Sequence, residues 1–289
     1  MCFEDRCNSL VVGEHSSFED CGFYVSGRNN EVIIGSNCRI IDKFIKERKT
    51  INMQINLIGT GAMYTAYNSA CTLIDNKIIV DMPNGTVKQM LKKRLPVENI
   101  DIILITHMHG DHTADIPFFL KYIFNYKKRN TPINIIGPIG TKSKIKDLFD
   151  SYNFENGAEI ERFFNIHFIE ILENEFKINE YNIKSYLMLH GEEKPALGYI
   201  IDNKLGVTGD SGLCEGIETI FKKSTVIIAD SSSKTGDMCH MGINDLIYLS
   251  NKYNKKIFCT HLLDTTRREL IENVHQNIIV KDDFYVSEI

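Results

Sequence analysis

The chain has 289 residues, of which 43% are hydrophobic and 25% are charged, and its formal net charge is −5. This balance excludes a chain that is disordered along most of its length, and the mild acidity gives no support to a surface that coats nucleic acid broadly. Apolar runs such as Ile102–Ile105 are too short to span a membrane, and the N-terminus lacks the pattern of a secretory signal. We therefore expect a cytoplasmic protein without a membrane partner.

The first 50 residues differ from the rest. Val11–Phe18 and Ile33–Ile40 share one order of residue types: two apolar, glycine, two polar, one small, one of any type, one apolar. Over Ser9–Ile40 the repeated pattern resembles the coils of hexapeptide-repeat acyltransferases. About three stacked coils are needed to bury a core, and only two are present. A pair of hairpin-like strands packed on the main domain therefore fits the pattern as well. Four of the eight cysteines lie here. Free thiols are expected without a secretory signal, and a structural zinc stays open. We expect a β-rich extension over 1–50 and the main domain over 51–289.

From Ile51 onward, strands and helices alternate, which is typical of a layered α/β protein. Strands are expected at Ile51–Ile58, Cys71–Ile74, Ile78–Val80, Ile100–Thr106, Ile133–Ile136, Ile166–Ile171, Ile183–Leu189, Leu197–Ile201, Leu205–Thr208, Val226–Ala229 and Lys256–Thr260. Helices are expected at Val87–Arg94, Ile116–Tyr126, Lys142–Tyr152, Gly212–Lys222, Asn244–Tyr253 and Arg267–Asn277. Within this pattern there is no glycine-rich phosphate loop of the G-x-x-x-x-G-K type.

A dense histidine motif follows the strand that ends at Thr106. It reads His107-Met108-His109-Gly110-Asp111-His112. Imidazole nitrogen and carboxylate oxygen together suit Zn²⁺, and also manganese or iron. Alternate residues of an extended segment point the same way, so His107 and His109 can share one metal, while Asp111 and His112 lie in the turn beyond and can face a second metal.

The motif resembles that of the metallo-β-lactamase superfamily, in which H-x-H-x-D-H is followed by a lone His, a lone Asp and a last His at later strand ends. His190, Asp210 and His261 stand at those places. The resemblance covers about Ile51 to His275 and implies a four-layered αββα sandwich with metals at the strand edge. It also implies that one metal is held by His107, His109 and His190 and the other by Asp111, His112 and His261, with Asp210 as the bridge.

Within the superfamily the chain is most similar to the ribonuclease Z-like branch. The similarity rests on Ile55–Gly61, on Asn68-Ser69-Ala70 and on the segment from Asp230 to Gly242. That branch carries a histidine about 20 residues before the last ligand, and His240 stands there. We expect Asp230 to orient His240, and we expect both to be catalytic together with Asp111. His15, His167 and His275 are expected to be structural, His167 in an apolar strand and His275 on a helix face.

The charge of such a site favours an anionic substrate. Two divalent ions bring four positive charges, and Asp111 and Asp210 return only two negative ones, so a phosphodiester would be attracted. Adjacent metals can also lower the pKa of a bridging water. We expect a hydrolase that uses two divalent ions, most simply zinc, to cleave a phosphodiester or similar small anionic ester with a metal-bound hydroxide.

Substrate identity stays open at this stage. Ribonuclease Z has a long tRNA-gripping arm, and no such insert lies between His190 and Asp210. An armless relative suggests a small substrate such as a cyclic nucleotide. The alternatives are a tRNA 3′-processing endoribonuclease and a non-catalytic metal-binding interaction protein. RNA and a second copy of the chain are open as partners, since similar proteins are often dimers.

Overall fold

The structure is a computed structural model that describes residues 52–154 and 156–289 and two short strands further toward the N-terminus. The chain divides into two compact units, Met1–Asn52 and Met53–Ile289. In the first unit, β1 (Tyr24–Val25) pairs antiparallel with β2 (Val32–Ile33). Apart from these two strands, the first 50 residues lie outside the described residues, including most of the coil-like repeat expected over Ser9–Ile40, the cysteines of that segment and His15. The extension over 1–50 therefore stays a prediction.

The second unit contains two mixed sheets, each of seven strands among the described residues. The first has the order β16 (Tyr285–Glu288), β3 (Gln54–Gly59), β4 (Cys71–Ile74), β5 (Ile78–Val80), β6 (Ile102–Leu104), β7 (Ile133–Pro138) and β8 (Ile166–Ile171). The second has the order β15 (Ile278–Ile279), β14 (Lys256–Thr260), β13 (Val226–Asp230), β12 (Leu205–Val207), β11 (Ala196–Ile201), β10 (Tyr181–Met188) and β9 (Asn174–Ile178).

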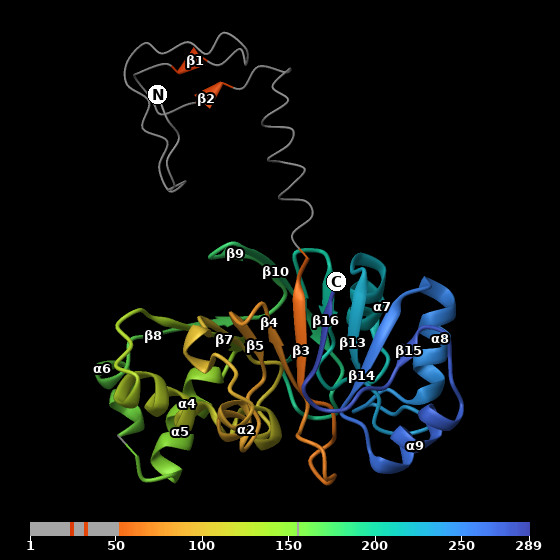
Figure 1. The fold of residues 1–289 in the computed structure, drawn as a ribbon, viewed down its shortest axis with the longest axis horizontal. Helices are drawn as coiled ribbons and strands as arrows, with labels where there is room; N and C mark the ends of the chain where they lie inside the picture. The colour runs from red at the N-terminus through yellow and green to blue at the C-terminus, as the bar shows by residue number, and fades with distance from the viewer. Residues whose placement is uncertain (1–23, 26–31, 34–51, 155) are drawn as a thin grey trace. The chain divides into compact units, whose positions relative to one another are not determined.

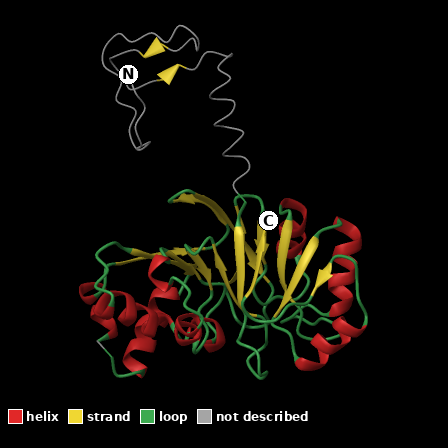
Figure 2. Ribbon diagram, viewed as in Figure 1, coloured by secondary structure: helices red, strands yellow, loops and turns green. Residues whose placement is uncertain are grey.

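Helices cover the outer face of each sheet, as the red ribbons on either side of the yellow strands show in Figure 2. The helices of the first half are α2 (Thr86–Lys92), α3 (Gly110–Thr113), α4 (Ile116–Leu120), α5 (Thr141–Ser151) and α6 (Ile160–Phe163), with η1 (Val97–Asn99), the π-helix η2 (Lys121–Tyr126) and η3 (Gly157–Glu159). Those of the second half are α7 (Glu215–Lys223), α8 (Ile243–Tyr253) and α9 (Asp264–Glu272) (Figure 1).

Apolar side chains on both faces of the strands explain the four layers. On β6, Ile103 packs in the cluster under the first set of helices, whereas Leu104 packs in the cluster between the sheets. On β13, Ile227 packs under the second set of helices and Ile228 faces the space between the sheets. Because neighbouring strand residues point to opposite faces, strands that are buried on both sides read as unbroken apolar runs. The expected αββα sandwich is confirmed.

Three local predictions differ from the structure. The helix expected over Ile116–Tyr126 is α4 followed by the π-helix η2. Asp111 and His112, expected in a turn, lie in the short helix α3. The last helix begins at Asp264, where a carboxylate suits the positive end of the helix dipole. It ends at Glu272, so His275 lies past the helix and not on it.

The two sheets are tied together just before the histidine motif. The hydroxyl of Tyr199, a fully buried residue of β11, donates a hydrogen bond of 2.6 Å to the carbonyl oxygen of Ile105. The backbone N–H of Leu197 donates to the carbonyl oxygen of Thr106 at 2.8 Å. These two bonds fix the direction in which the chain leaves β6 and enters the motif.

Tyr199→Phe should lower the free energy of unfolding by about 1–3 kcal/mol, because the Ile105 carbonyl would then be buried without a partner. Chemical denaturation measures this loss. Tyr181→Phe is the matched control, since the Tyr181 hydroxyl lies 3.3 Å from Oδ2 of Asp75, a half-buried carboxylate that water can still reach. Equal stability of the Tyr199→Phe variant and the wild type would contradict this role.

Candidate metal centre

Three histidines from both sheets turn ring nitrogens toward one point. His107 and His109 follow β6, and His190 follows β10. His109 Nδ1 lies 3.0 Å from His107 Nε2 and 3.2 Å from His190 Nε2. His107 and His190 are buried, but the side chain of His109 is 47% exposed. These histidines therefore form one group of three nitrogen donors at the edge of the sandwich.

A second group lies beside the first. Asp111 and His112 lie on α3, and His261 follows β14. Asp111 Oδ2 lies 3.6 Å from His261 Nε2 and 3.7 Å from His112 Nε2. All three residues are buried. His261 adopts a left-handed backbone conformation with a φ of 53°, which belongs to the sharp turn that follows the strand.

Asp210 stands between the two groups. Its Oδ2 atom lies 3.2 Å from His261 Nε2, 3.3 Å from His112 Nε2 and 3.9 Å from His107 Nε2. The residue follows β12 and is buried. One carboxylate oxygen thus faces donors of both groups, which is the position that a bridging ligand needs.

The residues present fit divalent metal ions. In the part of the chain that the structure describes, His112 Nε2 and Asp111 Oδ1 are buried and have no hydrogen-bond partner. The donor atoms within each group lie within 4.8 Å of one another. Imidazole lone pairs that converge in this way repel each other unless a cation lies among them. Nitrogen and carboxylate oxygen are also the donors that Zn²⁺ takes.

Outer hydrogen bonds fix the tautomers of the buried histidines. Carbonyl and carboxylate oxygens only accept, so the Nδ1 atoms of His190 and His112 must donate, to the Cys239 carbonyl at 2.7 Å and to Asp81 Oδ2 at 2.8 Å. The Thr106 hydroxyl donates to Asp81 and can accept from His107 Nδ1 at 3.0 Å.

His261 has a similar partner on its outer side. The Ser232 hydroxyl lies 2.8 Å from His261 Nδ1 and also donates to Asp230 Oδ1 at 3.1 Å. With the proton on Nδ1, each of the four buried rings leaves its Nε2 lone pair facing inward, as a metal ligand requires. Sequence reasoning did not identify Asp81, Thr106 or Ser232. A carboxylate directly after a buried strand was the one available signal, and it applies to Asp81.

His240 and Asp230 form a pair next to the second group. His240 Nδ1 lies 2.9 Å from Asp230 Oδ2, and its ring stacks on that of His261 with centroids 4.8 Å apart. Asp230 is buried at the end of β13 and also accepts from the Ser211 N–H. The structure therefore brings together all nine residues that the sequence singled out: His107, His109, Asp111, His112, His190, Asp210, Asp230, His240 and His261.

Electrostatics set the charge states of the cluster. Burial would raise the pKa of Asp210, but His261 and His112 outweigh it and hold that pKa well below its usual range. Burial lowers the pKa of His107 well below its usual value, and nearby His112 adds to the effect. Burial would also lower the pKa of His240, but the hydrogen bond and charge of Asp230 raise it to about 9.

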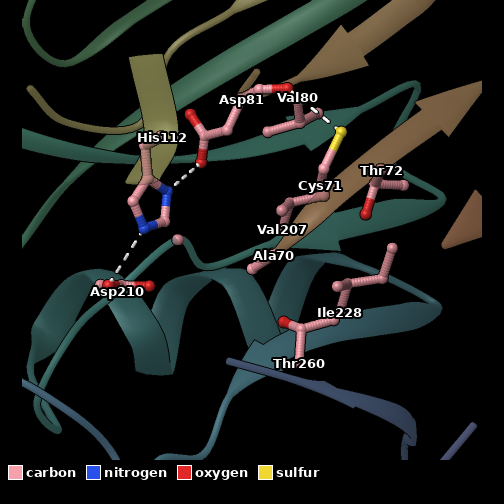
Figure 3. Close-up of a pocket in the computed structure, with 11 residues that line it drawn as sticks. Ala70, Cys71, Thr72, Val80, Asp81, His112, Val207, Asp210, Ile228 and Thr260 are labelled. Carbon is pink, nitrogen blue, oxygen red and sulfur yellow. Dashed lines mark hydrogen bonds and ion pairs between the residues drawn. The ribbon is translucent and has the colours of Figure 1, made fainter. Parts of the chain in front are cut away.

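A small cavity adjoins this cluster between the two sheets (Figure 3). It has a volume of about 20 Å³ and is lined by Asp81, His112 and Asp210 together with Thr72 and Thr260. That volume accommodates one water molecule. The cavity is too small for a larger molecule, whereas His109 and His240 lie on the side of the cluster that solvent reaches.

Two further histidines lie outside the cluster. His167 is exposed on β8, and His275 is partly buried.

Among the described residues, no helix is both long enough and apolar enough to cross a membrane.

Comparison with known proteins finds relatives of the second unit. The family model described as "Anti-Pycsar protein Apyc1" matches residues 53–285. Ribonuclease Z of Thermococcus kodakarensis is 36% identical over 127 residues, which cover 44% of this chain and 38% of that protein. The match therefore spans well under half the length of that curated relative. The ribonuclease Z-like similarity expected from the motif is confirmed.

Solved structures confirm the fold. The metallo-β-lactamase fold protein YhfI from Bacillus subtilis superposes with a TM-score of 0.66 at 15% identity, covering 82% of this chain and 99% of that one. A diphosphatase from the PhnP family superposes with a TM-score of 0.67 at 13% identity, covering 82% of this chain and 98% of that one.

Asp81→Asn should weaken the binding of one metal ion about 10–100-fold. Asp81 Oδ1 accepts from the Thr106 N–H at 2.8 Å, so the amide oxygen of the variant would stay there and its NH₂ group would face His112 Nδ1. A donor at that place would favour the proton on Nε2, the nitrogen that faces the second group. Competition with a coloured chelator measures the affinity. Asp75→Asn is the control, because Asp75 is a half-buried carboxylate that accepts a hydrogen bond from the Gln54 N–H and lies away from the cluster. Unchanged affinity in Asp81→Asn would show that the contact does not tune the site.

Proposed function

We propose, since the chain belongs to the Anti-Pycsar protein Apyc1 family, that it is a metal-dependent hydrolase of small phosphodiesters that uses two divalent ions. The observation that carries the proposal is Asp210 Oδ2, which faces donors of two adjacent groups at one edge of the sandwich. We assign His107, His109 and His190 to one ion, Asp111, His112 and His261 to the other, and Asp210 to both. The nitrogen-rich donor set favours zinc, with manganese or iron as alternatives.

Divalent ions held there would supply Lewis acidity that activates water and offsets negative charge on the phosphoryl oxygens. The direct carboxylate donors, Asp111 and Asp210, carry two negative charges against the four positive charges of two ions. The site would therefore attract an anion from the solvent side. This supports a phosphodiester as the class of substrate.

Asp111 is suited to orient the attacking water. Its Oδ2 atom faces His261 and His112, while its Oδ1 atom is buried and has no hydrogen-bond partner among the residues that the structure describes. A free, buried carboxylate oxygen can accept a hydrogen bond from a water molecule and hold it in line with the phosphorus atom.

His240 is suited to act as the general acid. Asp230 holds its Nδ1 atom, so Nε2 is the ring nitrogen left to meet the substrate. With its pKa raised to about 9, the ring carries a proton near neutral pH and can give it to a leaving alkoxide. This matters most for a poor leaving group, such as the sugar hydroxyl released when a cyclic nucleotide opens.

A tRNA 3′-processing endoribonuclease is the second candidate, because a curated relative is a ribonuclease Z. Against it stands the short connection between β10, which ends at Met188, and β11, which begins at Ala196. This connection has no room for an arm that grips RNA. The cytoplasmic location that the sequence predicts remains a proposal, as does the homodimer that the sequence left open.

The choice between small and large substrates can be tested directly. The zinc-loaded wild type should hydrolyse methyl p-nitrophenyl phosphate and a 3′,5′-cyclic nucleotide. It should bind a tRNA precursor only with the weak, salt-dependent affinity of non-specific contacts, about 10⁻⁴–10⁻⁶ M. Filter binding and product analysis measure both properties. Tight tRNA binding with cleavage at the 3′ end would establish the second candidate instead.

His240→Ala should keep the bound metals and the fold but lower kcat about 10²–10⁴-fold on a substrate with an alkyl leaving group. The loss should be much smaller on methyl p-nitrophenyl phosphate, because nitrophenolate needs little protonation. Asp230→Asn should give a milder form of the same defect, and His167→Ala is the surface control. If His240→Ala instead loses a metal ion, His240 is a ligand and not an acid.

A further inference from the structure

We propose that Glu193 is a positioning residue for His109: it selects the tautomer with which His109 meets its metal ion, and so controls the release of that ion alone. The proposal rests on the proposed function, since it needs two metal ions at the cluster. It concerns a side chain that the motif does not contain and that neither set of direct donors includes.

His109 is oriented differently from the other four histidines. His107, His112, His190 and His261 turn Nε2 inward and have an outer partner on Nδ1. His109 turns Nδ1 inward, so Nε2 is its outer nitrogen. To offer a lone pair at Nδ1, the neutral ring must carry its proton on Nε2. The outer nitrogen of His109 therefore needs an acceptor, as the other rings have.

Glu193 is placed to be this acceptor. Its Oε2 atom lies 3.9 Å from His109 Nε2. At 3.9 Å the contact is not a hydrogen bond in this structure. A small rotation of either side chain closes it, and both have the freedom to rotate, being 47% and 29% exposed.

The backbone around Glu193 makes this contact specific. Glu193 Oε1 accepts from the Met108 N–H at 3.3 Å, within the motif itself, and the Glu193 N–H donates to the His190 carbonyl at 3.0 Å. The turn after His190 is also held by the Gly191 N–H, which donates to the Met238 carbonyl. Glu193 thus links the two chain segments that supply His107, His109 and His190.

The two metal positions should consequently differ in how fast they release a bound ion. Asp111, His112 and His261 are all buried, and the outer partners of the two imidazoles are buried as well. The other group includes the half-exposed His109, whose outer partner lies on an exposed turn. Removing Glu193 should therefore loosen the first group and leave the second unchanged.

The test follows zinc release from the two-zinc holoenzyme into excess 4-(2-pyridylazo)resorcinol. The wild type should show a fast and a slow phase of one equivalent each. Glu193→Ala should accelerate the fast phase about 10–100-fold and leave the slow phase unchanged. Glu193→Gln should largely restore the wild-type rate, because its carbonyl oxygen can still accept from Nε2. Glu192→Ala, which removes the exposed neighbouring carboxylate, is the matched control.

The tautomer gives a second readout that does not depend on release rates. In ¹⁵N-edited NMR spectra of the zinc-loaded protein, His109 should be the one ring among the five that keeps its proton on Nε2. In Glu193→Ala the signal of this proton should weaken, because the proton exchanges faster with water.

The outcomes separate the two proposals. A wild type that binds fewer than two zinc ions overturns the proposed function, and the Glu193 proposal with it. If the wild type binds two zinc ions but Glu193→Ala releases zinc at unchanged rates in both phases, the role of Glu193 alone is overturned. Equal acceleration of both phases would indicate a general loosening of the fold and would also contradict that role.

Discussion

The buried carboxylate of Asp210 is surrounded by imidazoles that come from both halves of the sandwich, and this arrangement constrains the rest of the molecule. A buried charge destabilises a fold unless it is paired closely and with good geometry. Asp210 Oδ2 lies 3.2 Å from His261 Nε2 and 3.3 Å from His112 Nε2. These two histidines follow strands of different sheets, β14 and β6. The sheets must therefore meet at a fixed separation and register at this edge.

The fold meets this requirement by placing its polar residues at strand ends and its apolar residues between the layers. The apolar cluster between the sheets extends up to Val80, Leu104 and Val207, the last residues of three strands that lead into the site. Directly beyond them, backbone and hydroxyl contacts between the sheets replace apolar packing. The transition from core to site takes place within two or three residues, so the buried residues of the site lie directly on the packed core.

The sequence was sufficient to predict most buried strands and the first four candidate donors, because both have dense local signals. Unbroken apolar runs indicated the buried strands, and the motif from His107 to His112 placed four donors within six residues. The later donors, His190, Asp210 and His261, have no such local motif and were found through the resemblance to the metallo-β-lactamase superfamily, in which a His, an Asp and a last His follow later strands.

The supporting residues could not be predicted, because their role depends on partners far away in the chain. Asp81 precedes His112 by 31 residues, and Glu193 meets the motif across 85 residues. Each is a single polar residue without a local pattern. The strand β9 was missed for a related reason: as an exposed edge strand, it carries no apolar run.

Anomalous diffraction from crystals of the zinc-loaded protein tests the central claim most directly. Data collected on both sides of the zinc absorption edge should give two peaks, one on each side of the Asp210 carboxylate. One should lie among His107, His109 and His190, and the other among Asp111, His112 and His261. A single peak, or a peak between Asp230 and His240, would contradict the account, because Asp210 would not be a bridge and His240 would not be free to act as an acid.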